Sequence, residues 1–203
     1  MNMDSETIDS FLEALIQVAR QNGASDAKVV STRDVMVDDS LTKLCSDSGC
    51  KNYGLTNNCP PHVSGSAGFK ELLKDYTRAV VFKIDVPIEV LLSEDSSRAF
   101  RLLHKIAAIT EKAAVEKGYK RSIAFAGGSC KILFCQKHRD CIVLSEKGEC
   151  RHPQIARPSL SGFGINVSQL VKAVGWQMER ITCETDPEVV SMGALCGLVL
   201  IGC

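Results

Sequence analysis

The stretch AVVFKIDV at residues 79–86 is the clearest strand signal in the sequence, and it decides the fold class. It is rich in β-branched and aromatic residues, which favour extended backbone. Residues 89–117 then predict a long helix that ends at Gly118, and residues 122–126 predict a second short strand. Strand, helix and strand in this order indicate a βαβ unit with at least one parallel pair of strands. The side chains that trace one face of the helix are Phe100, Leu103, Ala107, Thr110 and Ala114.

The rest of the sequence extends this framework in both directions. The pattern predicts helices at 8–19, 69–76 and 167–174, the last capped by Asn166, and short strands at 27–31, 35–37, 177–183 and 194–201. We therefore expect a single α/β domain over residues 1–203, with an α+β arrangement as the alternative. Its expected architecture is a two-layer sandwich, in which a mixed sheet of about five strands carries the 89–117 helix on one face.

Composition narrows the class of protein and its partners. The chain has 203 residues, of which 45% are hydrophobic and 24% charged, so it is not a disordered protein. The 24 basic residues balance 24 acidic ones, which argues against a nucleic-acid binder. The longest apolar run, 193–203, is too short to span a membrane. The acidic start of the chain does not resemble a signal peptide, so we expect a cytoplasmic protein with no nucleic-acid or membrane partner.

The chain contains ten cysteines, and most of them gather in two segments without regular hydrophobic periodicity, residues 44–66 and 127–164. In a reducing compartment, clustered cysteines more often bind metal or carry out redox chemistry than form disulfides. We expect the two loops to meet at one end of the framework. The seven candidate metal ligands are Cys45, Cys50 and Cys59 in the first loop and Cys130, Cys135, Cys141 and Cys150 in the second. The others, Cys183, Cys196 and Cys203, lie in apolar sequence and are expected to be buried small side chains.

The loop sequences favour an iron–sulfur cluster over zinc. Thiolates repel one another and gather only around a cation. Loops rich in Gly and Ser can turn backbone N–H groups toward cluster sulfurs, and Pro60 directly after Cys59 turns the chain away, as in bacterial ferredoxins. Structural zinc sites prefer cysteines separated by two to four residues, usually in two pairs. The shortest gap here is four residues, found twice, so zinc stays an alternative to a [4Fe–4S] cluster.

Histidines and basic residues also border the cysteines. A Rieske-type centre needs two histidines, but we favour loop hydrogen bonds or solvent exposure for His62, His138 and His152, and a structural role for His104 in the helix. The basic side chains of the second loop would either balance an anionic cluster or form a solvated surface. They are Lys131, Lys137, Arg139, Arg151 and Arg157, and for Arg157 we favour a structural role in a turn.

Three motifs carry a resemblance to a known family: CKNYGLTNNCPP at residues 50–61, GGSC at 127–130 and CRHPQIARPSLSGFGINV at 150–167. The sequence resembles the predicted metal-binding proteins known as domain of unknown function 2284, which are small, cysteine-rich and mostly from anaerobic bacteria and archaea. The likeness runs from about Cys45 to Gly175. It implies metal binding by the seven loop cysteines, which correspond to the family's cysteine-rich motifs, and it implies no particular reaction.

Two functions remain open from the sequence. No nucleotide-binding or serine-hydrolase motif is present, and whether the chain is an enzyme stays undecided. The leading hypothesis is one or two [4Fe–4S] clusters in an electron carrier or iron–sulfur oxidoreductase component, with a redox partner protein. The second loop supplies four ligands. The first supplies three, so it would hold a cluster with one open iron, recruit a distant ligand or exchange ligands with the second loop. The alternative is a non-catalytic zinc protein, in which the metal orders the loops into an interaction surface.

Overall fold

One four-stranded antiparallel sheet forms the centre of the described chain. The structure is a computed structural model that describes residues 5–47, 49–179, 181–182 and 184–203. In the sheet order β1-β2-β4-β3, every neighbouring pair is antiparallel, with Phe82 opposite Gly197 and Ala124 opposite Val199. The strands are β1 (Asp26–Ser31), β2 (Arg78–Pro87), β3 (Ile123–Phe125) and β4 (Met192–Ile201).

The predicted strand–helix–strand unit is present, but its two strands are not paired. β2 and β3 are joined by the long helix α5 (Ser96–Glu116), and both pair antiparallel with β4, which lies between them. They therefore run in the same direction without sharing hydrogen bonds. The prediction of a parallel pair and a mixed sheet was wrong, because the most distant strand in sequence inserts into the middle. The fold is α+β, which was the alternative to α/β.

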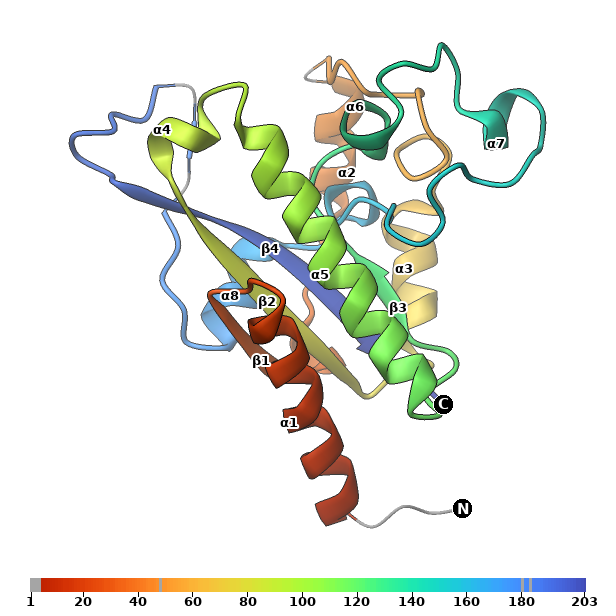
Figure 1. Cartoon of the computed structure of the whole chain (residues 1–203), viewed down its shortest axis with the longest axis vertical. Helices are drawn as coiled ribbons and strands as arrows, with labels where there is room; N and C mark the ends of the chain where they lie inside the picture. Colours follow the sequence, from red (N-terminus) through yellow and green to blue (C-terminus); the bar gives the residue numbers. More distant parts are fainter. Residues whose placement is uncertain (1–4, 48, 180, 183) are drawn as a thin grey trace.

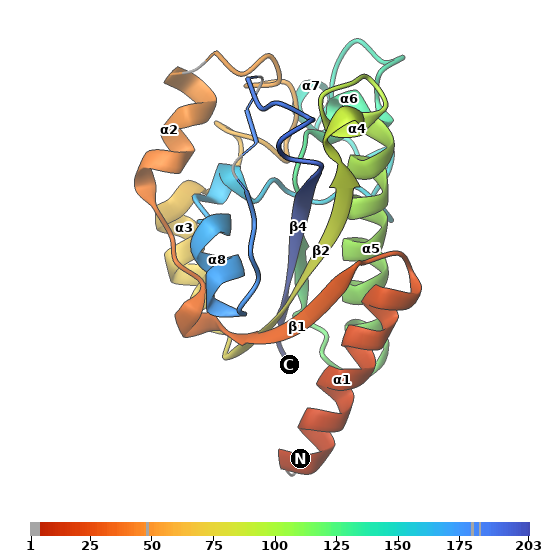
Figure 2. The same cartoon turned by 90° about the vertical axis from the view of Figure 1, so that its left-hand side faces the viewer.

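Helices cover both faces of the sheet, whereas the sequence suggested two layers. Figure 2 shows α1 (Ser5–Gln21) and α5 on one side and α2 (Asp39–Asp47), α3 (Gly65–Leu73) and α8 (Val167–Ala173) on the other. Alternate residues of β2 enter the two hydrophobic cores: Val80 and Phe82 face α5, while Ala79 and Val81 face the opposite side. A strand buried on both faces explains why 79–86 reads as a nearly continuous apolar run.

Some of the shorter predicted elements are present and others are not. The helices expected at 8–19, 69–76 and 167–174 correspond to α1, α3 and α8, although α3 ends at Leu73. The Asn166 side chain accepts a hydrogen bond from the Gln169 N–H at 3.1 Å, as expected of a cap. Residues 35–37 form no strand and contribute only a single bridge, Val37 to Ile165. Of the expected strand at 177–183, residues 177–179 and 181–182 are irregular, and positions 180 and 183 lie outside the described residues. The described part of the chain thus has four strands rather than five.

The two cysteine loops meet at one end of the sheet, as predicted. Figure 1 shows the short helices α6 (Cys130–Phe134) and α7 (Ile142–Ser145) at the same end as the loop that follows α2. The loops are joined directly, because the Ser159 N–H donates to the Asn58 carbonyl at 3.0 Å. Ser159 in turn bridges to Ala126 at the end of β3. Further short helices are α4 (Ile88–Leu91), η1 (Thr32–Asp34) and η2 (Ser161–Phe163). Among the described helices, none is long and apolar enough to cross a bilayer.

Candidate metal centre

The structure divides the seven loop cysteines between two neighbouring cavities. The four-cysteine cavity, with a volume of about 110 Å³, is lined by every cysteine of the second loop, Cys130, Cys135, Cys141 and Cys150. The three-cysteine cavity, with a volume of about 130 Å³, is lined by every cysteine of the first loop, Cys45, Cys50 and Cys59. The sequence indicated the ligands but not this division. Among the described residues, no three Cys, His, Asp or Glu side chains converge closely enough to hold a single metal ion.

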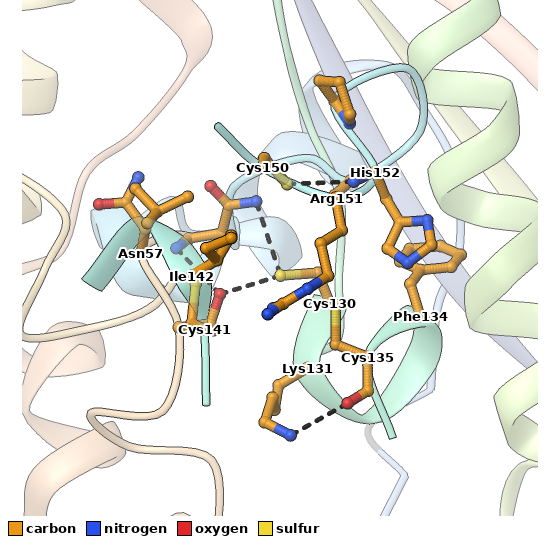
Figure 3. Close-up of a pocket in the computed structure, with 15 residues that line it drawn as sticks. Asn57, Cys130, Lys131, Phe134, Cys135, Cys141, Ile142, Cys150, Arg151 and His152 are labelled. Carbon is orange, nitrogen blue, oxygen red and sulfur yellow. Dashed lines mark hydrogen bonds between the residues drawn. The ribbon is translucent and has the colours of Figure 1, made fainter. Parts of the chain in front are cut away.

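The four-cysteine cavity is lined by irregular segments of both loops and by two short helices (Figure 3). Cys130 begins α6 and Cys135 directly follows it, so both ends of this five-residue helix contribute a cysteine to the cavity. Cys141 directly precedes α7 on the opposite wall. Cys150 lies in the irregular segment that leads back toward the sheet.

The first loop reaches across to the second at Cys130. The Thr56 hydroxyl lies 3.0 Å from the Cys130 sulfur, and the Asn58 side-chain amide donates to the same sulfur at 3.6 Å (Figure 3). Both Thr56 and Cys130 are buried. Burial raises the pKa of the Cys130 thiol, and these two groups act in the opposite direction because they stabilise the thiolate. A residue 74 positions earlier in the chain thus tunes a candidate ligand.

Backbone groups form hydrogen bonds with two further sulfurs of this cavity, those of Cys150 and Cys141. The His152 N–H donates to the Cys150 sulfur at 3.4 Å. For Cys141, burial acts to raise the pKa, but hydrogen bonds from the backbone of Asn57, Val143 and Leu144 outweigh it, and the pKa lies below its usual value. Burial, followed by the neighbouring Cys150, raises the pKa of Cys135. Amide donors directed at sulfur are the pattern that iron–sulfur sites require, and here they serve two cysteines.

Besides its cysteines, the three-cysteine cavity is lined by serine hydroxyl groups and by no charged side chain among the described residues. Ser129, Ser159 and Ser161 line it, and the hydroxyls of Ser159 and Ser161 lie 3.0 Å apart. Burial and the neighbouring Cys50 raise the pKa of Cys45, while the Ser161 hydroxyl lowers it. No Lys, Arg, His, Asp or Glu among the described residues lines this cavity. The four-cysteine cavity differs, because Lys131, Arg151 and His152 line it.

The two cavities share a wall. Ser129 lines one and Cys130, the next residue, lines the other. The pKa of the Cys59 thiol is raised to about 11, chiefly by burial, with the Cys130 thiol across the wall acting in the same direction and the Ser129 hydroxyl acting against it. A charge on Cys130 is therefore felt at Cys59 in the other cavity. This adjacency was not predicted, because it depends on the contact between the two loops.

Helix α5 anchors the second loop to the framework. The Arg157 guanidinium pairs with Glu111 at 2.6 Å, and both side chains are largely buried. The Arg157 N–H donates to His104 Nδ1 at 3.1 Å, and Arg101 Nε donates to the Leu133 carbonyl at 2.8 Å. Gly128 has a φ of +83°, and a Cβ there would lie 3.0 Å from the Phe100 ring. The structural roles expected for His104 and Arg157 agree with these contacts. The sequence analysis did not identify Glu111 and Arg101. Both lie on the same face of the helix as His104, and polar residues on that face could have indicated a contact with the loop.

The remaining predicted residues take ordinary structural positions. His62 Nε2 lies 3.2 Å from the Gly54 carbonyl, and His138 is exposed, which agrees with the loop hydrogen bond or solvent exposure expected for these two histidines. His152 packs its ring on Phe134, with centroids 5.9 Å apart. Cys196 is buried, as expected. Cys203 is exposed, so the prediction that it is buried was wrong, and Cys183 lies outside the described residues.

Comparison with known families agrees with this site. The profile of the family described as predicted metal-binding protein (DUF2284) matches residues 28–201, and the chain belongs to that family. The matched range includes both cysteine loops and both cavities. No curated protein and no solved structure is detectably similar to the chain. The donor set, four thiols around one cavity with hydrogen-bond donors on the sulfurs, fits a thiolate-bound metal group.

Proposed function

We propose that the chain is an iron–sulfur protein in which the second-loop cysteines hold a [4Fe–4S] cluster with a redox role. The observation that carries the proposal is the four-cysteine cavity. Its volume of about 110 Å³ is several times the ~10–15 Å³ that one water molecule requires, which suits a polynuclear group better than a single ion. Four thiols also match the usual ligand number of such a cluster. The ligands are Cys130, Cys135, Cys141 and Cys150.

Several residues of the chain would form hydrogen bonds with the proposed cluster or place a charge beside it. When bound, a [4Fe–4S] cluster supplies one-electron redox chemistry. Thr56, Asn58 and the His152 N–H donate hydrogen bonds to sulfur, which stabilises the more negative, reduced form. Arg151 is fixed at the rim because its guanidinium donates to the Asp140 carbonyl at 3.0 Å. Its positive charge lowers the electrostatic cost of adding an electron.

The rim of the cavity supports electron exchange with a partner protein. Cys135, Cys141 and Cys150 are only partly buried, so a cluster they hold lies near the surface. The basic groups at this rim, Lys131 and Arg151, favour a partner with an acidic docking surface. A cytoplasmic location, which keeps the thiols reduced, belongs to the same proposal.

Anaerobic purification with metal and sulfide analysis tests the proposal. Wild type is expected to contain iron and acid-labile sulfide, at about four of each for every cluster, and to give a paramagnetic signal on reduction between roughly −700 and +450 mV. Cys130→Ser should lose the second-loop cluster. Cys203→Ser is the matched control, because Cys203 is exposed and lines neither cavity. A colourless protein with zinc and no sulfide would contradict the proposal and favour the non-catalytic zinc alternative.

A further inference from the structure

We infer that the three-cysteine cavity is a second metal centre with one coordination position open, and that this position takes a small uncharged oxygen donor such as water, an alcohol or a carbonyl group. The inference rests on the proposed function, since it extends the same thiolate chemistry to Cys45, Cys50 and Cys59. It names a binding site, with its class of ligand, that the four-cysteine cavity does not provide.

The first step concerns the number of thiols. Among the described cysteines, only these three line the cavity. Cys130, a described thiol that acts on Cys59 across the shared wall, lines the neighbouring cavity and lies against Thr56 and Asn58 there. A [4Fe–4S] cluster held by three thiolates retains one iron position that another group must fill. Metal sites with such an open position are those that bind substrate or activated water.

The second step concerns what faces that position. The Ser129 hydroxyl lies beside the Cys59 thiol, is buried, and makes no properly oriented hydrogen bond with any described residue. A buried polar group without a partner costs ~1–3 kcal/mol, so a ligand that bonds to it recovers that free energy. Ser159 and Ser161 add a hydroxyl pair on the same wall. Hydroxyls both donate and accept, which suits the oxygen of water, an alcohol or a carbonyl.

The third step concerns charge and access. Three thiolates around a [4Fe–4S]²⁺ core give a net negative centre, and among the described residues no basic side chain lines the cavity to offset a further anion. The ligand is therefore expected to be neutral. An access route exists, because Cys45 and Cys50 also line a surface groove of about 400 Å³ beside Leu41, Leu44 and Val167. Its apolar side chains favour a ligand that carries a small hydrocarbon group.

The test is electron–nuclear double resonance of the reduced protein in H₂¹⁷O. Wild type should show ¹⁷O coupling that ethanol displaces and acetate does not. Cys59→Ser should lose this coupling and keep the signal of the four-cysteine centre. Ser129→Ala should weaken ethanol binding by about fivefold, the effect of one neutral hydrogen bond, and Ser161→Ala likewise. Ser10→Ala is the matched control, because Ser10 is exposed on α1 and lines neither the cavity nor the access groove.

Three outcomes would overturn the inference while the proposed function stands. The first is iron and sulfide sufficient for one cluster only, unchanged in Cys59→Ser. The second is two centres without ¹⁷O coupling, together with loss of one centre in Cys183→Ser, which would make Cys183 the fourth ligand. The third is loss of that centre in Ser161→Ala with recovery in Ser161→Cys, which would make Ser161 a resident ligand. Zinc without sulfide would instead overturn the proposed function, and the inference with it, because the three cysteines do not converge closely enough on a single ion.

Discussion

At the scale of single residues, Thr56 is the side chain whose effect on the proposed cluster is most direct. Its hydroxyl lies 3.0 Å from the Cys130 sulfur. Thr56→Val keeps the shape of the side chain and removes the hydrogen bond. The reduced cluster is expected to lose more stabilisation than the oxidised one, so the midpoint potential should fall by about 40 mV, the one-electron equivalent of ~1 kcal/mol. A redox titration followed by EPR measures the shift.

Thr42→Val provides the control for that measurement. The Thr42 hydroxyl donates to the Asp39 carbonyl of the same helix at 2.8 Å, and Thr42 lines neither cavity. The midpoint potential of the cluster in Thr42→Val should equal that of wild type. Equal shifts in both variants would show that the Thr56 effect is a general loss of stability rather than a contact with the cluster.

His104 makes a second prediction at this scale, concerning pH. Its side chain is 0% exposed, and burial lowers its pKa to about 4, with the positive charge of Arg157 acting in the same direction and nearby carbonyls of Gly127 and Ile155 opposing it. Because the unfolded state binds the proton first, stability is fully present above about pH 6.5 and falls as the pH drops toward 4. The free energy of unfolding should fall by about 3 kcal/mol, which corresponds to a pKa lowered from 6.5 to about 4.

Denaturant unfolding between pH 4 and 7 measures this effect against His104→Asn. The asparagine oxygen still accepts the Arg157 N–H bond but has no proton to bind. The variant should therefore lose less stability over this range than wild type. Parallel curves for the two proteins would show that His104 does not contribute to the pH dependence.

The ion pair between Arg157 and Glu111 is the third residue-scale prediction. Glu111 also accepts the Ala124 N–H at 2.7 Å, so it ties both β3 and the second loop to α5. In Glu111→Gln the amide oxygen can still accept the Ala124 N–H, but the largely buried guanidinium of Arg157 loses its charge partner. We expect the free energy of unfolding to fall by about 3 kcal/mol. Glu116→Gln is the control, because its pair with Lys112 is exposed and should cost less than about 1 kcal/mol. Equal losses would contradict the anchoring role.

At the scale of elements, the pairing of β2 with β4 depends on one glycine. A Cβ at Gly197 would lie 2.1 Å from the Phe82 ring, which lies directly opposite. Gly197→Ala must displace a fully buried aromatic side chain, and overpacking of this kind costs ~1–3 kcal/mol. The double variant with Phe82→Leu should lose less stability than the sum of the single variants, as a double-mutant cycle would measure. Additive losses would show that the ring and the glycine are not coupled.

The same pairing shows how far the sequence predicted the elements. β2 and α5 were predicted because long periodic patterns are local signals. The position of β4 was not, because nothing near 79–86 or 122–126 indicates that residues 192–201 will separate them. That choice depends on contacts such as Phe82 over Gly197, which join residues more than a hundred positions apart. Short segments such as 35–37 were over-predicted because a run of only three apolar residues carries little information.

For the site, the sequence predicted the ligands better than their grouping. Clustering in polar loops identified the seven cysteines, and the structure brings all of them to one end of the sheet in two cavities. The roles of Thr56 and Ser129 could not be predicted, since a hydroxyl next to a distant cysteine has no spacing rule. These contacts exist only because Asn58 and Ser159 join the two loops.

At the scale of the whole molecule, removal of metal should divide the chain into two stability classes. The sheet and its helices have two hydrophobic cores and are expected to stay folded. None of residues 135–150 is buried, so we expect metal binding to supply the folding free energy of this segment. Anchors at Leu133 and Arg157 should keep the ends of the second loop protected, while residues 135–150 open. Hydrogen exchange with and without metal measures this. Equal protection of 135–150 in both forms would show that packing alone holds the loop.

The position of β4 also sets an order of events during synthesis. Both cysteine loops leave the ribosome before residues 192–201, yet β3, from which the second loop departs, has no partner in the sheet until β4 arrives. Until then the second loop departs from a strand that is not yet held in the sheet. Insertion of the last strand is expected to fix β3 beside the rest of the sheet, and with it the position of the second loop against the first. The nascent protein is therefore expected to need a reducing environment until β4 has been added, and the proposed metal centres are expected to form only after that step.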